Sequence, residues 1–290
     1  MTRTVELSSA PSLGPLFAQA VVRAPFRKGR ELPDLVVRQL GASVDRDQLA
    51  AYDDVCGFAL RDTLPATYIH VLVFPLQTRV MADAAFPFPL VGSVHLTNTI
   101  VQHRPVLAGE LLDIEVRATD VRPHFRGAQV DLVAEVSVAG ETVWQEVSTY
   151  LFRGQKVAGT APLRSVDPQL PTVAGALWRV PGDIGRRYAA VAGDVNPIHL
   201  HPLGAKALGF PTTIAHGMWS ASHALAALAN RLPDGFTYTV EFKKPILIPS
   251  SVNFVAQQRD SSWDLALTNA RKGTVHMTGS IRAQAPSTIS

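Results

Sequence analysis

Three observations predict that this 290-residue chain is an α+β protein made of two copies of one unit. Similar segments recur in the same order in its two halves. Within each half, helical segments come first and consecutive strand-like segments follow, which is typical of an α+β unit with an antiparallel sheet. Hydrophobic residues make up 47% of the chain and charged residues 18%, so each unit can form a core. We expect each sheet to wrap around one long buried helix, and the two sheets to join side by side.

The internal repeat is seen in short matches that keep their order and nearly keep their spacing along the chain. The matched segments are 52–57 (YDDVCG) with 188–193 (YAAVAG), 65–70 (PATYIH) with 211–216 (PTTIAH), and 104–107 (RPVL) with 244–247 (KPIL). Each match alone is short. Together they indicate a duplication, because unrelated segments would not follow one another in the same order.

A boundary between the copies is predicted at residues 153–176. This stretch contains three glycines and three prolines and shows no apolar period, which is the composition of a linker. We therefore expect a first unit over residues 1–152 and a second unit over residues 177–290.

Each unit is expected to begin with a short helix and a longer buried one. The predicted helices are 45–56 and 68–83 in the first unit, and 182–192 and 216–230 in the second. Gly193 follows the short helix of the second unit and suits the left-handed conformation just past a helix end. The longer helix of the second unit is apolar on most faces and must be largely buried. Its counterpart contains Pro75, so we expect a kink or an interruption there.

Four strands are expected to follow the helices in each unit. They are recognised by period-two alternation and by β-branched residues. The predicted strands are 95–102, 111–118, 130–138 and 143–152 in the first unit, and 237–243, 252–258, 263–269 and 275–282 in the second.

The composition excludes several classes of protein. The formal net charge is only +3 and the longest basic cluster is 27–30, so the basic stripe of a nucleic-acid-binding protein is not seen. The single cysteine, Cys56, excludes an internal disulfide framework and a multi-cysteine metal site. The sequence shows no signal peptide and no apolar stretch of 18 residues, so we expect no transmembrane segment and a cytoplasmic location.

The densest polar segment beside apolar sequence is 192–199 (AGDVNPIH), which ends a predicted helix and turns through an Asn-Pro pair. The turn can bring the side chains of Asp194 and His199 to one spot. A carboxylate beside an imidazole suits general acid–base catalysis on a water molecule. The alternative is that Asp194 and Asn196 only cap the turn and that His199 is structural.

Two observations favour the catalytic interpretation. At the same spacing, the first unit has Phe58 and Thr63 in place of the acid–base pair, and a capping role alone would not require that difference. In addition, His216 and Gly217 begin the buried helix of the second unit. The first N–H groups of that helix have no intrahelical partner, so they would stabilise a carbonyl oxygen as it gains negative charge.

These residues resemble the hydratase 2 motif of the MaoC-like dehydratases. The likeness runs from Tyr188 through 192–199 to 209–218 (GFPTTIAHGM), and it continues at 242–249 (FKKPILIP). The whole chain resembles the two-copy members of this family, the double-hotdog (3R)-hydroxyacyl-thioester dehydratases of actinobacterial type. The resemblance implies two hotdog units, of which the second is catalytic. It also implies reversible dehydration of 3-hydroxyacyl thioesters in fatty-acid metabolism.

The resemblance further implies a role for each residue of the motif. Asp194 and His199 would hold the catalytic water, Asn196 would assist them, and the N–H of Gly217 would bind the thioester oxygen. The first unit, which lacks the pair, would shape the acyl-chain pocket instead. We expect no cofactor and no metal, because dehydration involves no redox change and the sequence contains neither a glycine-rich dinucleotide loop nor a P-loop.

The expected partner is an acyl-CoA or acyl-carrier-protein thioester. The residues that could bind such a substrate are His216, Lys206, Lys244 and Arg271, of which the three cations would meet phosphates of the carrier. A solvated basic surface explains these three equally well. The chain would act as a monomer of two repeats or as a homodimer.

Four alternative functions stay open at the level of sequence. A metal site would draw on Asp194, His199, His201, His216 and His223, although dehydration requires no metal. A serine hydrolase would use Ser220 or Ser222, but neither lies in a Gly-x-Ser-x-Gly elbow. An acyl-CoA thioesterase of the hotdog type, or a non-catalytic acyl-thioester-binding scaffold, would share the fold and the pocket.

Overall fold

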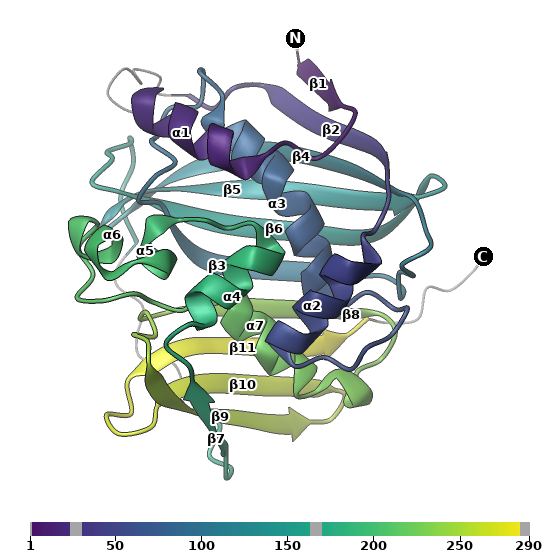
Figure 1. The fold of residues 1–290 in the computed structure, drawn as a ribbon, viewed down its shortest axis with the longest axis vertical. Helices are drawn as coiled ribbons and strands as arrows, with labels where there is room; N and C mark the ends of the chain where they lie inside the picture. The colour runs from purple at the N-terminus through teal and green to yellow at the C-terminus, as the bar shows by residue number, and fades with distance from the viewer. Residues whose placement is uncertain (1, 24–30, 163–169, 285–290) are drawn as a thin grey trace.

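The described part of the chain forms one sheet of 11 strands, in the order β1-β2-β4-β5-β6-β3-β8-β11-β10-β9-β7 (Figure 1). The computed structural model describes residues 2–23, 31–162 and 170–284. The basic cluster at 27–30 and part of the predicted linker lie outside the described residues. Neighbouring strands are antiparallel, except for the parallel pair β1 and β2. The predicted α+β class and the side-by-side joining of the two sheets are confirmed.

The strands of the first half are β1 (Arg3–Leu7), β2 (Leu35–Ala42), β3 (Val94–Gln102), β4 (Leu112–His124), β5 (Gly127–Val138) and β6 (Glu141–Arg153). Those of the second half are β7 (Ala176–Val180), β8 (Phe236–Phe242), β9 (Ser250–Arg259), β10 (Ser262–Asn269) and β11 (Val275–Ala283). All eight predicted strands are present, each within a few residues of its expected bounds apart from β4, which continues further.

The two halves of the sheet join through β3 and β8. Thr99 and Thr239 pair at the centre of this join, and their Oγ1 atoms are 3.3 Å apart. Outward from this point, β6, β5, β4 and β2 correspond in order to β11, β10, β9 and β7, as expected for a duplicated unit. Because backbone hydrogen bonds cross the join, the sheet has no interior edge. Buried apolar residues of both halves form one core cluster.

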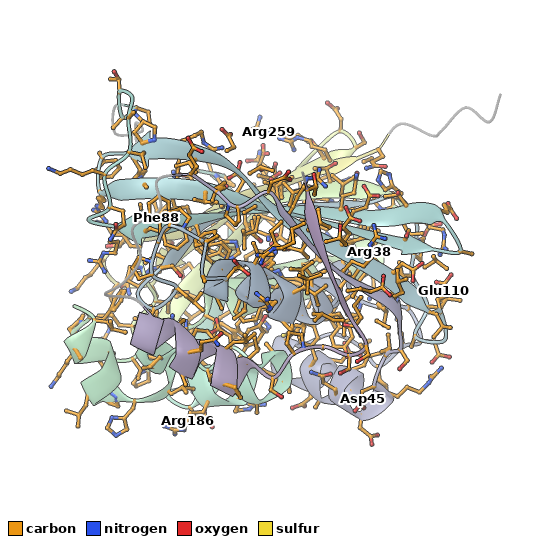
Figure 2. All side chains as sticks on the ribbon, turned by 90° about the horizontal axis from the view of Figure 1, so that it is seen from above. Arg38, Asp45, Phe88, Glu110, Arg186 and Arg259 are labelled. Atoms are coloured by element: carbon orange, nitrogen blue, oxygen red, sulfur yellow. The ribbon has the colours of Figure 1, made fainter. Side chains whose placement is uncertain are left out.

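The helices lie on one face of the sheet. In the view of Figure 2, Arg259 at the end of β9 lies on the sheet side, while Arg186 lies on the outer side of the helical layer. The helices of the first half are α1 (Leu13–Arg23), α2 (Arg46–Cys56) and α3 (Ala66–Ala82). Those of the second half are α4 (Ile184–Ala192), α5 (Pro197–Leu200), α6 (Pro202–Ala207) and α7 (Gly217–Ala226).

The central helices α3 and α7 are enclosed between the sheet and the other helices. In α3, 14 of 17 residues are buried, and the helix runs without interruption past Pro75. The expected interruption is therefore wrong, and a kink at Pro75 stays a prediction. A proline removes only one intrahelical hydrogen bond, and dense packing on all faces holds the helix together. Helix α7 is shorter than expected and is followed by a 3-10 turn, η2 (Ala229–Arg231).

The short helices α2 and α4 have the ends that the repeat predicts. Asp45 caps α2 by accepting hydrogen bonds from the N–H groups of Asp47 and Gln48, at 2.9 and 3.0 Å. Gly57 and Gly193 end α2 and α4 with φ values of 82° and 72°. This left-handed conformation strains any residue with a Cβ atom, so the expectation of a glycine helix end is confirmed.

The predicted alignment of 65–70 with 211–216 is displaced by five residues. Pro65 and His216 hold the same position, directly before α3 and α7. The residue before each of them donates an equivalent backbone hydrogen bond, 2.8 and 2.9 Å long. The match of 65–70 with 211–216 therefore arose by chance, although each segment lies near the start of the central helix of its half.

The displacement has a structural cause. The second half carries an additional segment with α5 and α6 between α4 and α7, and the first half has no counterpart between α2 and α3. Thr63 is consequently not the equivalent of His199. It forms an isolated bridge with Leu107, just as Ile214 does with Leu247. The first half therefore lacks the whole segment that holds His199.

Six elements were missed from the sequence: β1, α1, β2, β7, α5 and α6. The strands β1 and β7 have five residues each, and α5 and α6 have four and six, so they are too short to show a period. The boundary at 153–176 stays a prediction. No helix among the described residues is long and apolar enough to cross a membrane.

Candidate active site

The polar turn after α4 is built by local hydrogen bonds. Gly193 ends the helix, and one carboxylate oxygen of Asp194 accepts the N–H of Asn196 at 3.1 Å. The side-chain oxygen of Asn196 accepts the N–H of Ile198 at 3.4 Å and so caps α5. The capping interpretation is thus correct for Asn196 and for one oxygen of Asp194. The other oxygen, Oδ2, is left for another partner.

His199 is buried, with 8% of its surface exposed, and its ring is fixed by one hydrogen bond. Its Nδ1 donates to the carbonyl oxygen of Ile214 at 2.9 Å. Because a carbonyl oxygen only accepts, Nδ1 carries the hydrogen, and in the neutral ring Nε2 has a free lone pair. The backbone of His199 lies so close to α4 that a Cβ atom on Gly185 would be 2.2 Å from its carbonyl oxygen. Glycine at position 185 therefore allows α5 to dock on α4.

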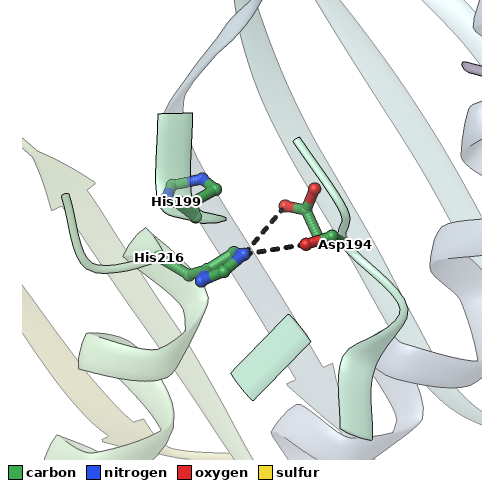
Figure 3. A group of neighbouring side chains, drawn as sticks. All are labelled: Asp194, His199 and His216. Carbon is green, nitrogen blue, oxygen red and sulfur yellow. Dashed lines mark hydrogen bonds and ion pairs between the residues drawn. The ribbon is translucent and has the colours of Figure 1, made fainter. Parts of the chain in front are cut away.

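His216 joins Asp194 to His199, as Figure 3 shows. Its Nε2 donates to the main-chain oxygen of Asp194 at 3.0 Å and lies 3.7 Å from Oδ2 of the same residue. The rings of His216 and His199 stack with their centroids 3.6 Å apart. The expected meeting of Asp194 and His199 is thus observed, with His216 as a third member.

Burial keeps both imidazoles of this cluster neutral. It lowers the pKa of His199, an effect that the negative charge of Asp194 partly opposes. It lowers the pKa of His216 well below its usual value, and the neighbouring His199 lowers it further. Near neutral pH, His199 therefore presents a lone pair rather than a positive charge, which suits a general base.

The N-terminus of α7 opens beside this cluster. His216 occupies the N-cap position without a capping hydrogen bond from its side chain, and Gly217 is the first helical residue. The N–H of a first helical residue has no acceptor within the helix. A Cβ atom on Gly217 would lie 3.0 Å from the ring of Phe242, so the absence of a side chain brings that ring against the helix end.

The cluster lines a cavity of about 160 Å³, roughly ten times the space that one water molecule requires. Both halves of the chain contribute to its wall. Its apolar lining includes Phe17, Val71, Phe74, Met81, Leu90, Phe210 and Phe242, and its polar lining includes His70, His95, Tyr150, Asp194, Asn196, His199, His216, Lys244 and His276. A cavity that is apolar with a few convergent polar groups is typical of a small-molecule site.

The metal-site alternative can be tested against the same contacts. One potential ligand atom each of Asp194, His199 and His216 lie within 4.8 Å of one another. However, Nε2 of His216 carries a hydrogen, because it donates to a carbonyl oxygen. A metal bound there would have only His199 and Asp194 as ready ligands, fewer than the three or four that protein zinc sites use. The donor set therefore fits proton transfer better than metal binding.

The predicted substrate-binding residues fall into two groups. His216 and Lys244 line the cavity. Lys206 lies on α6 and Arg271 in the turn between β10 and β11, both exposed and outside the lining. Their contact with a carrier phosphate stays a prediction. His201 lies outside the cluster, where its Nδ1 accepts the N–H of Leu203.

The serines weighed for a hydrolase are engaged within α7. The hydroxyl of Ser220 donates to the carbonyl oxygen of His216 at 3.4 Å, and that of Ser222 donates to Met218 at 2.6 Å. His223 bonds to the carbonyl oxygen of Cys56 in the first half. No serine–histidine pair therefore forms on this helix.

Sequence reasoning missed the polar residues that the first half places in the cavity. They include His70 of α3, His95 of β3 and Tyr150 of β6. The available signal was the position of His95 and Tyr150 on strands otherwise rich in apolar residues. It could not be used, because the cavity they face is formed by the other half of the chain.

Comparison with known proteins relates the chain to acyl-thioester dehydratases. Residues 166–279 match the MaoC like domain. The 3-hydroxyacyl-thioester dehydratase X of Mycobacterium tuberculosis (strain ATCC 25618 / H37Rv) is 39% identical over 254 residues, which cover 87% of this chain and 90% of that protein. The crystal structure of HtdX of Mycobacterium tuberculosis has a TM-score of 0.77 at 37% identity, and the match covers 86% of this chain and 100% of that one. An (R)-specific enoyl-CoA hydratase of Rhodospirillum rubrum is 39% identical over 69 residues, 22% of this chain and 48% of that protein.

The close approach of α4 to His199 yields a test of the docking. Gly185→Ala should lower the free energy of unfolding by about 2 kcal/mol, because the added methyl group overlaps the carbonyl oxygen of His199. Urea unfolding measures this change. The matched control is Gly14→Ala in α1, where nothing lies within 4 Å of the new Cβ atom, and it should leave stability unchanged or slightly raised. Equal effects of the two substitutions would show that α5 does not dock closely on α4.

The buried histidines yield a prediction on pH. Burial lowers the pKa of His199, His216 and His95, that of His95 to about 3, so all three bind fewer protons in the folded than in the unfolded state. Their contribution to stability is complete above the unfolded pKa of about 6.5 and is lost as the pH falls below it. Asp53 opposes this with one proton, because burial raises its pKa to about 6. The free energy of unfolding should therefore fall by about 2 kcal/mol between pH 7.5 and 5.5 in urea titrations. A rise over this interval would contradict the neutral state of the three rings.

Proposed function

The chain belongs to the MaoC-like dehydratase family, and we propose that it is a (3R)-3-hydroxyacyl-thioester dehydratase, which in the reverse direction hydrates trans-2-enoyl thioesters. The observation that carries this proposal is that Asp194, His199 and the open N-terminus of α7 line one largely apolar cavity. Acid–base groups and an oxyanion donor are the two requirements of this reaction.

The acid–base pair would manage the protons of the reaction. Loss of water removes a proton from C2 and delivers one to the oxygen that leaves C3, and hydration reverses both transfers. His199 supports this role with a free Nε2 lone pair, and Asp194 with Oδ2, the carboxylate oxygen that does not bind the N–H of Asn196. Because the two groups are close, their protonation is coupled and they act as a unit.

Two neighbours would position the pair. His216 holds Asp194 through a hydrogen bond to its main-chain oxygen and stacks on His199. Asn196 fixes the start of α5, the helix that carries His199. His216 and Asn196 would therefore act by positioning Asp194 and His199. This agrees with the assisting role that the family resemblance implies for Asn196.

The N-terminus of α7 would stabilise the thioester. As the C2 proton leaves, negative charge develops on the thioester oxygen, and a fixed N–H donor aimed at this oxygen lowers the barrier. Gly217 supports this role, because it is the first residue of α7 and its N–H has no helical acceptor. The positive end of the α7 dipole acts in the same direction.

The substrate would be a thioester of coenzyme A or of an acyl carrier protein. The apolar cavity wall suits an acyl chain. Lys244 lies at the cavity, while Lys206 and Arg271 are exposed and available to phosphates of either carrier. Single hotdog units form such a pair by associating with a second chain. Here both units lie in one chain and share one sheet, which favours function as a monomer.

Hydration of trans-2-enoyl-CoA substrates from C4 to C16 tests the proposed function. The purified protein should form (3R)-3-hydroxyacyl-CoA, and Asp194→Asn and His199→Ala should each lower kcat by about 10²–10⁴-fold, since each removes a proton-transfer group. Loss of absorbance of the enoyl thioester measures the rate, and chiral separation of the product measures the configuration. Hydrolysis to the free acid would favour a thioesterase, and binding without turnover a scaffold. Either result would contradict a dehydratase.

Independence from metal ions is a separate prediction. Since Nε2 of His216 is occupied by a hydrogen, we expect the hydration rate to stay unchanged after prolonged dialysis against EDTA. The rate of the same preparation dialysed without chelator is the reference. A rate that falls with EDTA and returns on addition of zinc would show that the cluster of Asp194, His199 and His216 binds a catalytic metal.

A further inference from the structure

Tyr150 is a residue of the first half that lines the cavity. Its side chain is buried, with 7% of the residue exposed, and it lines the cavity wall. Its hydroxyl forms no hydrogen bond within the described part of the chain. Yet it is not one of the enclosed polar atoms that lack a partner. The hydroxyl therefore reaches open space, and the cavity provides that space.

The ring of Tyr150 is held by the strand next to it. Tyr150 and His95 are directly opposite each other on β6 and β3. Their rings stack with centroids 4.5 Å apart and an interplanar angle of 13°. Cross-strand aromatic pairs of this kind stabilise a sheet and restrict the rotamers of both rings. The position of the Tyr150 hydroxyl is thus set by the sheet and not by a loop.

A buried polar network supports this pair from behind. Glu146 is 1% exposed, and its carboxylate accepts hydrogen bonds from His70 at 2.7 Å, Gln77 at 2.8 Å and Asn98 at 2.5 Å. Although burial opposes ionisation, His70 and Asn98 keep the pKa of Glu146 below its usual value. The ring of His70 lies 6.0 Å from that of His95, so the network and the ring pair form one connected group.

Tyr150 faces the acid–base residues of the second half. Burial raises the pKa of its phenol well above 10, and the negative charges of Glu146 and Asp194 raise it further. Tyr150 in turn contributes to the raised pKa of Tyr188, whose ring lies 4.9 Å from that of His216. Tyr150 lines the same cavity as Asp194, His199 and His216, and its hydroxyl stays protonated, as a hydrogen-bond donor must.

The duplicated sheet shows that the fold does not require these groups. Thr99 and Thr239 correspond at the join, and their neighbours on the other side are Val147 and Ser280. Counting from these neighbours, the equivalent of Glu146 is Gly279 and the equivalent of Tyr150 is Ala283.

The same sheet positions are therefore glycine and alanine in the second half. In the first half they are Glu146, which binds His70, and Tyr150, which lines the cavity with Asp194 and His199. This asymmetry ties the polar residues of the first half to the chemistry of the second.

We propose that Tyr150, contributed by the first half, donates a hydrogen bond from its hydroxyl to the oxygen at C3 of the substrate. The inference rests on the dehydration proposed above. As the C3–oxygen bond breaks, charge accumulates on that oxygen, and a fixed donor stabilises it without transferring its own proton. In the direction of hydration, the same hydrogen bond orients the attacking water. The first half then supplies a catalytic residue in addition to a pocket wall.

Tyr150→Phe tests the proposal, because it removes one oxygen and keeps the stacked ring. We expect kcat and kcat/KM for enoyl-CoA hydration to fall together by about 10–100-fold, the result for a contact made mainly in the transition state. The thermal unfolding midpoint should not fall, since the hydroxyl has no partner in the protein. The matched control is Tyr238→Phe, on the equivalent sheet face of the second half, where the hydroxyl donates to Ala221 at 2.9 Å outside the cavity lining. It should leave kcat unchanged.

A double variant tests whether Tyr150 acts together with the acid–base pair. If it does, then adding Tyr150→Phe to Asp194→Asn should lower kcat by less than threefold further, because groups that act as a unit are not additive. Full additivity, a change in KM alone, or an unchanged rate in Tyr150→Phe would each overturn the inference while the wild-type enzyme still hydrates enoyl-CoA. A wild-type protein without hydration activity would overturn the proposed function and this inference together.

Discussion

The pairing of β3 with β8 is the constraint on which the rest of the structure depends. It closes the sheet between the two halves and centres their correspondence on Thr99 and Thr239. Because the strands continue as one sheet across this join, residues of β3 and β6 lie in the same cavity wall as the start of α7. The cavity is consequently lined by both copies, and neither half contains all of its wall. A two-copy chain can therefore change one copy independently of the other, which a symmetric dimer of single units cannot do.

The chain has used this freedom in two places. Only the second half has the segment with α5 and α6, which carries His199 and is docked on α4 through Gly185. The first half has polar residues at strand positions where the second half has glycine and alanine. The two changes meet at one cavity. At the corresponding place in the first half, Pro65 occupies the N-cap position that His216 has in the second. The helix α3 then begins with Ala66 where α7 begins with Gly217. A proline N-cap and an alanine leave no imidazole and place a side chain at the helix end.

The sequence was sufficient for most of the fold and for the centre of the site. All predicted strands and helices are present, because strong period-two and helical patterns survive duplication and packing. Asp194, His199, His216 and Gly217 could be found because they lie within 24 residues of one another and belong to a dense motif. Four of the six missed elements, β1, β7, α5 and α6, are too short to show a period. The equivalence of Thr63 with His199 failed because constant spacing assumes that no segment is inserted, and α5–α6 is such an insertion. His95 and Tyr150 could not be assigned from sequence, because their proximity to Asp194 is created only by the join of β3 and β8.

The energetics of buried polar groups explain why this arrangement is confined to one half. Removing a carboxylate from water costs several kcal/mol, and only well-formed hydrogen bonds offset that cost. Glu146 has three such bonds, and its partners are drawn from α3 and β3, so the ionised network also rigidifies the wall that carries Tyr150. The second half solves the same packing problem without charge: Gly279 leaves no room for a side chain, and the hydroxyl of Tyr238 bonds to the carbonyl oxygen of Ala221. Since an uncharged arrangement is available within the same fold, stability alone gives no reason for the charged one.

The neutral, buried imidazoles of His199 and His216 also have a cost in stability. They weaken the fold in acid, while they leave a lone pair where a proton must be moved. The Glu146 network and the two buried imidazoles both depart from a purely apolar core. Both border the same cavity, so the chemistry in that cavity gives a common reason for them.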